Sequence, residues 1–273
     1  MIRRASLWSD PRVKPPFKAA EVDWQHPLAR HLVGCWLFNA PYNIPFDMVQ
    51  QTPGTIGFGT PLWTSAGGQM SGIDVEAPEC LHVAHAVLSP AFPWKVVPPA
   101  ATFLYGVTLD ITNEVQILSS KAGGADGPFI WISATGFVTT RFVELGSDTT
   151  ATTALVAGRY AVVGGVYTGV NQQPVMKGIR EGTPTAITFV TETGVYHIGS
   201  RSDHAANRSM DGRLHWHFVW NRLLPDVELL QMTIEPFAFF RPIIRRRWFV
   251  PAAAVAAAGG FRSRIAGGLV VGG

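Results

Sequence analysis

The chain has 273 residues, of which 47% are hydrophobic and 15% charged, so it has ample material for a packed core and is not globally disordered. Its 28 glycines and 20 prolines follow no Gly-X-Y period, which excludes collagen and favours many short strands joined by turns. The net charge of +3 hides an asymmetry, because residues 1–20 hold five basic side chains and one acid, residues 241–273 hold six arginines and no acid, and the rest holds 11 basic and 18 acidic side chains. The ends therefore carry +10 and the body −7, which indicates terminal segments that meet an acidic partner rather than a nucleic-acid-binding face.

Residues 1–23 are rich in proline and basic side chains and show no hydrophobic period, so they predict an extended N-terminal arm. No apolar stretch follows the Arg3-Arg4 pair, and we therefore predict neither a signal peptide nor a twin-arginine leader, but a product made in the cytoplasm. The arm's predicted partner-binding residues are Arg3, Arg4, Arg12 and Lys14.

Residues 24–242 alternate short runs of Val, Ile, Thr, Phe and Tyr with clusters of Gly, Pro, Asn and Asp. This pattern is typical of antiparallel strands in a sandwich or barrel. The predicted strands are 33–39, 56–60, 81–84, 101–110, 114–121, 128–133, 136–142, 158–167, 173–179, 195–199 and 212–220. About ten strands in this span predict a single all-β domain.

One short helix is predicted near 226–233, because Pro225 precedes it, acids lie in its first turn, and Leu229 and Met232 fall on one side. The aromatic segment that follows is too apolar to face water and should lie against the body or a neighbour. Its predicted partner-binding side chains are Phe237, Phe239 and Phe240.

Residues 243–273 predict a second arm, first basic and then rich in Ala and Gly. An apolar triplet follows the three arginines, which suits docking into a protein groove better than a nucleic-acid-binding tail. The predicted partner-binding residues here are Arg245, Arg246, Arg247, Trp248 and Phe249. The apolar stretch 248–260 is too short to span a bilayer, so no membrane partner is predicted.

The chain lacks the recognisable patterns of common catalytic and metal sites. A Glu-x-Asp-x-Glu run, a Gly-x-Ser-x-Gly elbow and a phosphate-binding glycine loop are all absent, so we predict no catalytic residue, no cofactor and no enzymatic activity. His215 and His217 would share one face of a regular strand, but two ligands do not make a metal site, and none is predicted. Cys35 is predicted to be a small buried hydrophobe, with a bridge to Cys80 left open.

Aromatic side chains leave a lectin-like function open. Trp63, Trp94 and Trp131 lie in or near loop-bounded segments, where an indole can stack on a sugar ring. In a large sandwich such residues also serve as core or interface, so a glycan is the alternative partner and not the first one.

The segments 211–229 and 26–39 resemble the closing strand and helix and the opening strand of laminin-G-like, concanavalin A-like jelly-roll domains. The order of the intervening strands is similar too, and the whole looks most like the members found among tailed-phage structural genes. The resemblance implies an antiparallel two-sheet jelly-roll sandwich with one short helix and extended N- and C-terminal arms. Many members carry an acidic residue where this chain has His215 and Trp216, so a calcium-assisted sugar site is not expected.

From these observations we predict a non-enzymatic virion structural protein, a capsid decoration (cement) protein held by its arms. Its partners would be the major capsid protein or another virion lattice protein and further copies of itself, with a trimer favoured by analogy, and not nucleic acid. Its predicted location is the virion, on the capsid surface rather than the tail. The alternative is a glycan-binding tail adhesin.

Overall fold

In a computed structural model, the chain divides into two units, Met1–Pro242 and Ile243–Gly273. The structure describes residues 8, 15, 20–38, 46–58, 62–64, 72–75, 80–83, 88–93, 95–110, 115–121, 128–142, 147–191, 194–199 and 210–243. The fold presented below therefore belongs to the first unit. In the described part of the chain, no helix is long and apolar enough to cross a membrane.

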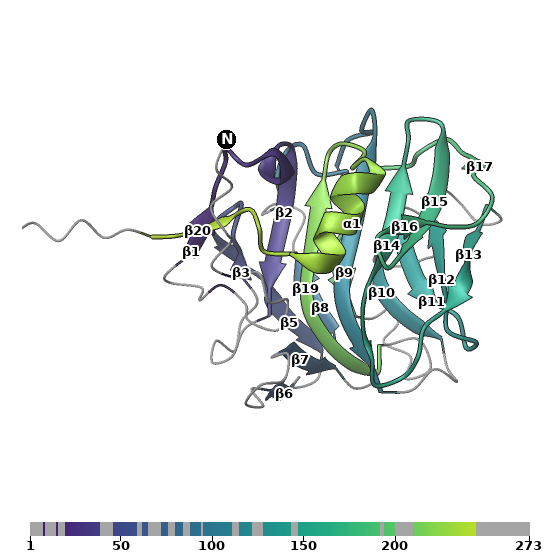
Figure 1. Ribbon diagram of the computed structural model, residues 1–273, viewed down its shortest axis with the longest axis horizontal. Coiled ribbons are helices and arrows are strands. Elements are labelled where there is room, and N and C mark those ends of the chain that lie inside the picture. Colours follow the sequence, from purple (N-terminus) through teal and green to yellow (C-terminus); the bar gives the residue numbers. More distant parts are fainter. Residues whose placement is uncertain are drawn as a thin grey trace, which may run out of the picture. The chain divides into compact units, whose positions relative to one another are not determined.

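A large antiparallel sheet forms the centre of the fold (Figure 1). Its main path, in spatial order, is β16 (Ile179–Arg180), β15 (Asn171–Met176), β14 (Tyr160–Tyr167), β9 (Ala101–Leu109), β19 (Gly212–Trp220), β2 (Leu32–Leu37), β3 (Phe46–Asp47) and β4 (Thr52–Pro53). Beside this path, β17 (Thr185–Ala186) pairs with β15, β7 (Gly72–Val75) with β19, and β6 (Leu62–Thr64) with β7.

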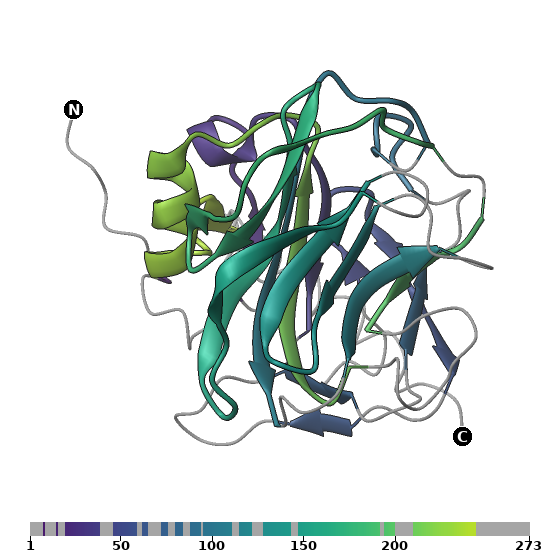
Figure 2. The same ribbon diagram turned by 90° about the vertical axis from the view of Figure 1, so that its right-hand side faces the viewer.

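A second, smaller antiparallel sheet packs against one face of the large sheet. Its order is β13 (Thr149–Ala154), β12 (Phe137–Arg141), β11 (Phe129–Ile132), β10 (Gln116–Lys121), β18 (Tyr196–Ile198), β8 (Cys80–Val83) and β5 (Thr55–Phe58). Turned by 90°, the molecule shows the two sheets as layers, with the helix outside the large sheet (Figure 2). The two-sheet antiparallel sandwich predicted from the sequence is confirmed.

The inner core fills the space between the sheets. It includes Trp36, Phe103, Tyr105, Ile130 and Tyr196, all without exposed surface. Successive side chains of a strand point to opposite faces, so every second side chain along β9, β11 and β14 enters this layer. Burial of large apolar side chains here is the main stabilising contribution to the sandwich.

The outer core lies on the opposite face of the large sheet. Trp216, Phe218 and Trp220 of β19 alternate towards this face, which α1 (Asp226–Ile234) covers with Leu229 and Met232. The 3₁₀ turn η1 (Pro27–Ala29) adds Leu28 and Ala29. The large sheet is thus packed on both faces.

The aromatic tail after α1 belongs to the same outer core, which corrects the partner-binding role predicted for its phenylalanines. Phe237 and Phe239 are fully buried and Phe240 is 5% exposed. Their rings lie 5.3–6.5 Å from that of Phe218. The prediction that this segment is buried is confirmed. The large sheet of the same chain buries it, so these three side chains do not form a surface for a neighbour.

Two strands at the boundaries of the fold were not predicted. β1 (Ala20–Val22) pairs antiparallel with β20 (Phe240–Pro242), with Ala20 opposite Pro242. Residues assigned to an extended arm therefore include a strand, and Trp8 of the same arm is only 8% exposed within the outer core. Cys35 is a free, fully buried thiol, as predicted for a small hydrophobe.

Candidate glycan-binding surface

The β11–β12 hairpin carries two aromatic rings and a guanidinium on the face of the small sheet that points away from the inner core. Trp131 is partly exposed there, whereas Phe129 and Arg141 are only 6% and 9% exposed. Phe129 lies opposite Arg141 and Trp131 opposite Thr139 in the antiparallel register. The intervening Ile130 and Ile132 are fully buried in the inner core, so alternation directs Phe129 and Trp131 to the other face. The hydroxyl of Ser133 accepts the backbone N–H of Phe137 at 3.1 Å and stabilises the turn of the hairpin.

Arg141 is held in one position by its neighbours. Its guanidinium carbon lies 5.1 Å from the ring centre of Trp131 and 5.9 Å from that of Phe129. Arg141 donates from Nε and Nη2 to the two carboxylate oxygens of Asp148, at 2.5 and 2.7 Å. A bidentate pair of this kind fixes both side chains and leaves no net charge, so the surface does not select for an acidic ligand.

Hydroxyl groups continue this surface towards the edge strand β13. The hydroxyl of Thr150, which is exposed, lies 3.1 Å from that of Thr139, which is buried beneath it at 3% exposure. The Asp148 side chain is 39% exposed, and Trp131 is partly exposed. We call Phe129, Trp131, Thr139, Arg141, Asp148 and Thr150 the Trp131 patch.

The Trp131 patch combines the groups that bind sugars. An indole face can stack on the C–H groups of a sugar ring, and a carboxylate and a hydroxyl beside it can bind the ring's own hydroxyls. Sequence reasoning singled out Trp131 but missed Arg141 and Asp148. The signal for that pair, opposite charges seven residues apart across a hairpin, becomes recognisable only once β12 and β13 are known to be neighbours.

A second polar cluster lies inside the inner core, where no ligand reaches it. The Nδ1 of His217 lies 3.0 Å from the carbonyl oxygen of Leu104 and must donate to it, so Nε2 accepts from the Tyr196 hydroxyl at 2.9 Å. The Tyr196 oxygen in turn accepts from the Tyr105 hydroxyl at 3.0 Å. Burial lowers the pKa of His217 to about 3 and raises the pKa of both tyrosines, so all three groups stay neutral and hold the sheets together.

The predicted shared face of His215 and His217 is wrong. A β-bulge interrupts the pairing of β19 with β9 between Leu214 and Trp216. His217 therefore stacks on Tyr105 in the inner core, whereas His215 lies beside Tyr160 and 2.9 Å from the Thr108 hydroxyl on the outer face. Across the described residues, no group of three or more His, Cys, Asp or Glu side chains is placed to hold a metal ion.

Most of the remaining predicted site residues lie outside the described residues. These are Arg3, Arg4, Arg12, Lys14, Arg245, Arg246, Arg247, Trp248 and Phe249. The side chains of Trp63 and Trp94 are not described either.

Solved structures share this fold at low sequence identity. Domain 4 of AbnA, a GH43 extracellular arabinanase from Geobacillus stearothermophilus solved in complex with arabinotriose, matches with a TM-score of 0.57 and 9% identity, over 79% of this chain and 99% of that one. A Trypanosoma rangeli sialidase mutant displaying trans-sialidase activity matches with a TM-score of 0.55 and 12% identity over 77% of this chain. The same sialidase in complex with sialic acid matches with a TM-score of 0.55 over 75% of this chain.

The matches to the sialidase cover only part of that protein. This chain spans 33% of the length of the two sialidase chains. No family model matches the sequence, and no curated protein matches it either. At identities of 9–12% the solved structures show the fold alone, a concanavalin A-like antiparallel β-sandwich, as the resemblance implied.

The comparisons also correct one prediction. We predicted that the chain has no enzymatic activity, and this prediction is wrong. The solved structures that share its fold come from a sialidase and an arabinanase, which are enzymes. A missing Glu-x-Asp-x-Glu run excludes one arrangement of carboxylates and not hydrolases as a class.

Proposed function

We propose that this chain is a glycan-binding β-sandwich domain that binds an uncharged oligosaccharide on the Trp131 patch. The observation that carries the proposal is the partly exposed indole of Trp131 beside the neutralised Arg141–Asp148 pair. The fold match to an arabinanase domain solved with arabinotriose supports it, although that sugar belongs to that protein.

The test begins with the full chain on an array of neutral and acidic oligosaccharides, followed by calorimetry with the best ligand. Trp131→Ala should weaken binding at least about 10-fold, because the stacking surface is lost, and Trp131→Phe should retain part of it. Trp24→Ala is the matched control, since it removes a 53% exposed indole from the turn between β1 and η1. β1 and β2, which flank this turn and η1, lie at the left of Figure 1, and β12 and β13 lie at its right.

Two results would contradict the proposal. One is an array on which no glycan binds. The other is a Trp131→Ala variant that folds normally and binds as tightly as the unmodified chain.

Attachment to a virion lattice is the second candidate, and the charge distribution favours it. Terminal segments that carry +10 beside a body of −7 suit an acidic lattice such as a capsid surface, with the major capsid protein as partner. Copy number in purified particles tests this role, because a decoration protein is present in hundreds of copies and an adhesin is scarce. Removal of residues 243–273 should then reduce loading onto particles that lack the protein.

A further inference from the structure

Glu181 directly follows β16 in the large sheet, and its side chain reaches the edge strand β13 of the small sheet. Its carboxylate oxygen Oε2 accepts the backbone N–H groups of Thr152 and Thr153 at 2.9 and 2.7 Å and the Thr152 hydroxyl at 3.1 Å. Partial burial acts to raise the pKa of Glu181, but the hydrogen bonds from Thr153 and Thr152 lower it below its ordinary value of 4.5, so the side chain is ionised at neutral pH. No group among the described residues donates to the second oxygen, Oε1, which is therefore able to accept from a ligand.

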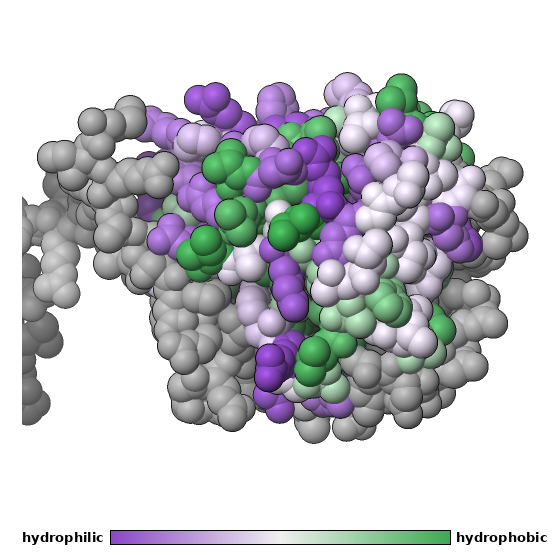
Figure 3. Space-filling model, turned by 45° about the vertical axis from the view of Figure 1, so that its right-hand side comes forward, coloured by the Kyte–Doolittle hydropathy of each residue, from purple (hydrophilic) through white to green (hydrophobic). Residues whose placement is uncertain are grey.

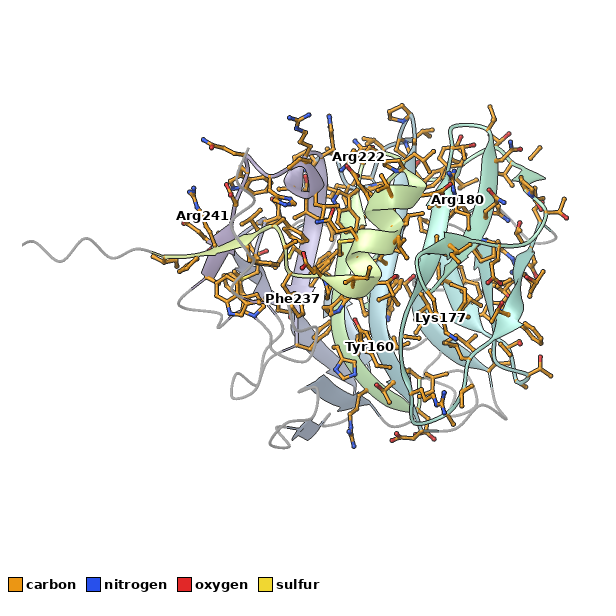
Figure 4. The ribbon with its side chains drawn as sticks, viewed as in Figure 1. Tyr160, Lys177, Arg180, Arg222, Phe237 and Arg241 are labelled. Atoms are coloured by element: carbon orange, nitrogen blue, oxygen red, sulfur yellow. The ribbon has the colours of Figure 1, made fainter. Side chains whose placement is uncertain are left out.

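The backbone around Glu181 is fixed by the large sheet. The N–H of Glu181 donates to the carbonyl oxygen of Pro174 in β15 at 3.0 Å. The preceding residue, Arg180, which is labelled in Figure 4, reaches instead to α1 and pairs with Asp226 at 2.7 Å. Because both its backbone and its carboxylate are already held, Glu181 loses little conformational freedom when it binds a ligand.

Thr152 lies on the same face of the small sheet as the Trp131 patch. Thr150 and Thr152 are exposed, whereas Thr149 and Ala151 are buried at 3% and 4% exposure. Alternation along β13 therefore directs Thr150 and Thr152 away from the inner core, as it does Trp131 on β11. Figure 3 turns forward the side that carries β13, β15 and β17, and many of the side chains there are pale, neither strongly hydrophilic nor strongly hydrophobic.

Glu181 and Thr152 extend the Trp131 patch in the direction that crosses the strands. The strand order is β11, β12, β13, and the Glu181 carboxylate lies beside the outer edge of β13. At about 4.8 Å per strand spacing, Trp131 and Glu181 are about 15 Å apart, a distance that takes about three linked sugar rings. The hydroxyls of Thr150 and Thr152 lie between them and can both donate and accept hydrogen bonds.

We propose that Glu181 is a ligand-binding residue of the extended Trp131 patch, and that the ligand is a linear, uncharged oligosaccharide of about three or more sugars that runs from Trp131 across β13 to Glu181. This inference rests on the proposed glycan-binding function. The Trp131 indole would stack on one ring, the threonine hydroxyls would bind the next, and Glu181 would accept from the hydroxyls of the third. The Arg141–Asp148 pair leaves the Glu181 charge without compensation, so an acidic chain would be repelled.

Calorimetry of the full chain with oligosaccharides of increasing length tests the proposal. The probes are neutral gluco-, xylo-, manno- and galacto-oligosaccharides, from the mono- to the hexasaccharide. For a series that binds, the affinity should rise between the disaccharide and the trisaccharide. Glu181→Gln should lower the affinity for the trisaccharide about 10-fold and leave that for the disaccharide unchanged, because a hydrogen bond to a charged group is stronger than one to an amide.

Two further variants make the result specific to the Glu181 charge. Glutamine at position 181 keeps an oxygen for the backbone N–H groups of β13, so Glu181→Gln should leave the unfolding midpoint in urea nearly unchanged. Glu235→Gln is the matched control, since it makes the same change at a partly exposed carboxylate just after α1 and should alter neither affinity. Trp131→Ala should weaken the binding of every length.

The outcomes separate this inference from the function on which it rests. If no probe and no glycan on the array binds the unmodified chain, the proposed function fails and the inference fails with it. If glycans bind through Trp131 but Glu181→Gln leaves the affinity for the trisaccharide unchanged, glycan binding stands and the role of Glu181 is overturned. A disaccharide that binds as tightly as the trisaccharide would overturn it as well.

Discussion

Single buried polar residues decide how the two sheets are joined. Gln172 of β15 is fully buried, and its amide oxygen accepts the backbone N–H of Phe142 at 2.8 Å. Its amide nitrogen donates to the carbonyl oxygens of Thr140 and Ser147 and to the Thr149 hydroxyl. One side chain of the large sheet thus satisfies backbone groups along the end of β12 and the start of β13.

Replacing Gln172 by Leu should lower the free energy of unfolding by about 2–4 kcal/mol. Leucine has a similar volume but leaves the Phe142 N–H and the Thr140 carbonyl buried without their partner, and each such group costs about 1–3 kcal/mol. Urea unfolding followed by circular dichroism measures the change. The partly exposed Gln173 provides the control, and a Gln173→Leu variant that loses as much stability would contradict this role for Gln172.

Asp47 predicts a pH dependence of stability. Its carboxylate accepts the backbone N–H groups of Cys35 and Val49 at 3.1 and 2.8 Å, yet burial raises its pKa from 3.8 to about 7. A raised folded-state pKa gives a stabilising contribution that is fully present below about pH 4 and is lost as pH rises to about 7. His217, whose lowered pKa acts in the opposite direction, makes the protein less stable as pH falls from about 6.5 towards 3.

Asp47→Asn isolates the first effect, because asparagine keeps the accepting oxygen and does not ionise. Between pH 4.5 and pH 7.5, the unmodified chain should lose more unfolding free energy than the variant does. The contribution of His217 is common to both proteins and cancels in the comparison. Urea midpoints at the two pH values provide the measurement, and equal losses would show that Asp47 is not the titrating group.

Individual strands show which features the sequence predicts and which it cannot. Strands β9, β12, β14 and β19 were predicted from their runs of Val, Ile, Thr, Phe and Tyr between turn residues, because buried strands need apolar and β-branched side chains. β13, with the sequence Thr-Thr-Ala-Thr-Thr-Ala, was missed, since it lacks large apolar residues. It is held partly by Glu181, whose carboxylate accepts the backbone N–H groups of Thr152 and Thr153.

Other features depend on contacts between distant segments. The bulge that separates His215 from His217 arises from the pairing of β19 with β9, which lies about a hundred residues earlier in the chain. The burial of Phe237 against Phe218 is likewise a property of the assembled sheet. Of the Trp131 patch, the sequence indicated only the indole, because its polar partners depend on which strands are neighbours.

Gly106 of β9 provides a test of how β19 packs. A Cβ at this position would lie 2.3 Å from Nε1 of Trp216, so the indole lies flat on the strand only because glycine is there. Gly106→Ala should displace the indole and break its hydrogen bond to the Tyr160 hydroxyl, at 3.0 Å, and cost about 1–3 kcal/mol of stability.

The penalty of Gly106→Ala should shrink in a Trp216→Phe background, where a smaller ring leaves room for the methyl group. Urea unfolding of the four proteins in this cycle gives the coupling energy. If the losses of unfolding free energy caused by the two substitutions simply add in the double variant, Trp216 is not the residue that requires glycine at position 106.

At the scale of the whole molecule, the large sheet is covered on both faces, and the segment after α1 supplies part of the cover on the outer face. This segment is therefore part of the fold. A chain that ends after Pro242 keeps Phe237, Phe239 and Phe240, whereas one that ends after Glu235 exposes Phe218 and Trp220 instead. Each buried phenylalanine contributes about 3–5 kcal/mol, and three together match the entire stability of a typical domain.

We therefore expect the chain that ends after Pro242 to unfold cooperatively and the one that ends after Glu235 to lack a cooperative transition. Circular dichroism in urea distinguishes the two, with near-ultraviolet signals reporting the aromatic packing. Similar unfolding midpoints for both truncated chains would show that the aromatic tail is dispensable.

The pairing of β1 with β20 also sets how the fold responds to force. Ala20 and Pro242 are register partners, so tension applied through the preceding and following segments would act on the same end of this two-stranded ribbon. Its hydrogen bonds, which lie across the strands, would then break one after another instead of sharing the load. The two strands would therefore separate at a low force, and the two main sheets would stay folded at that force.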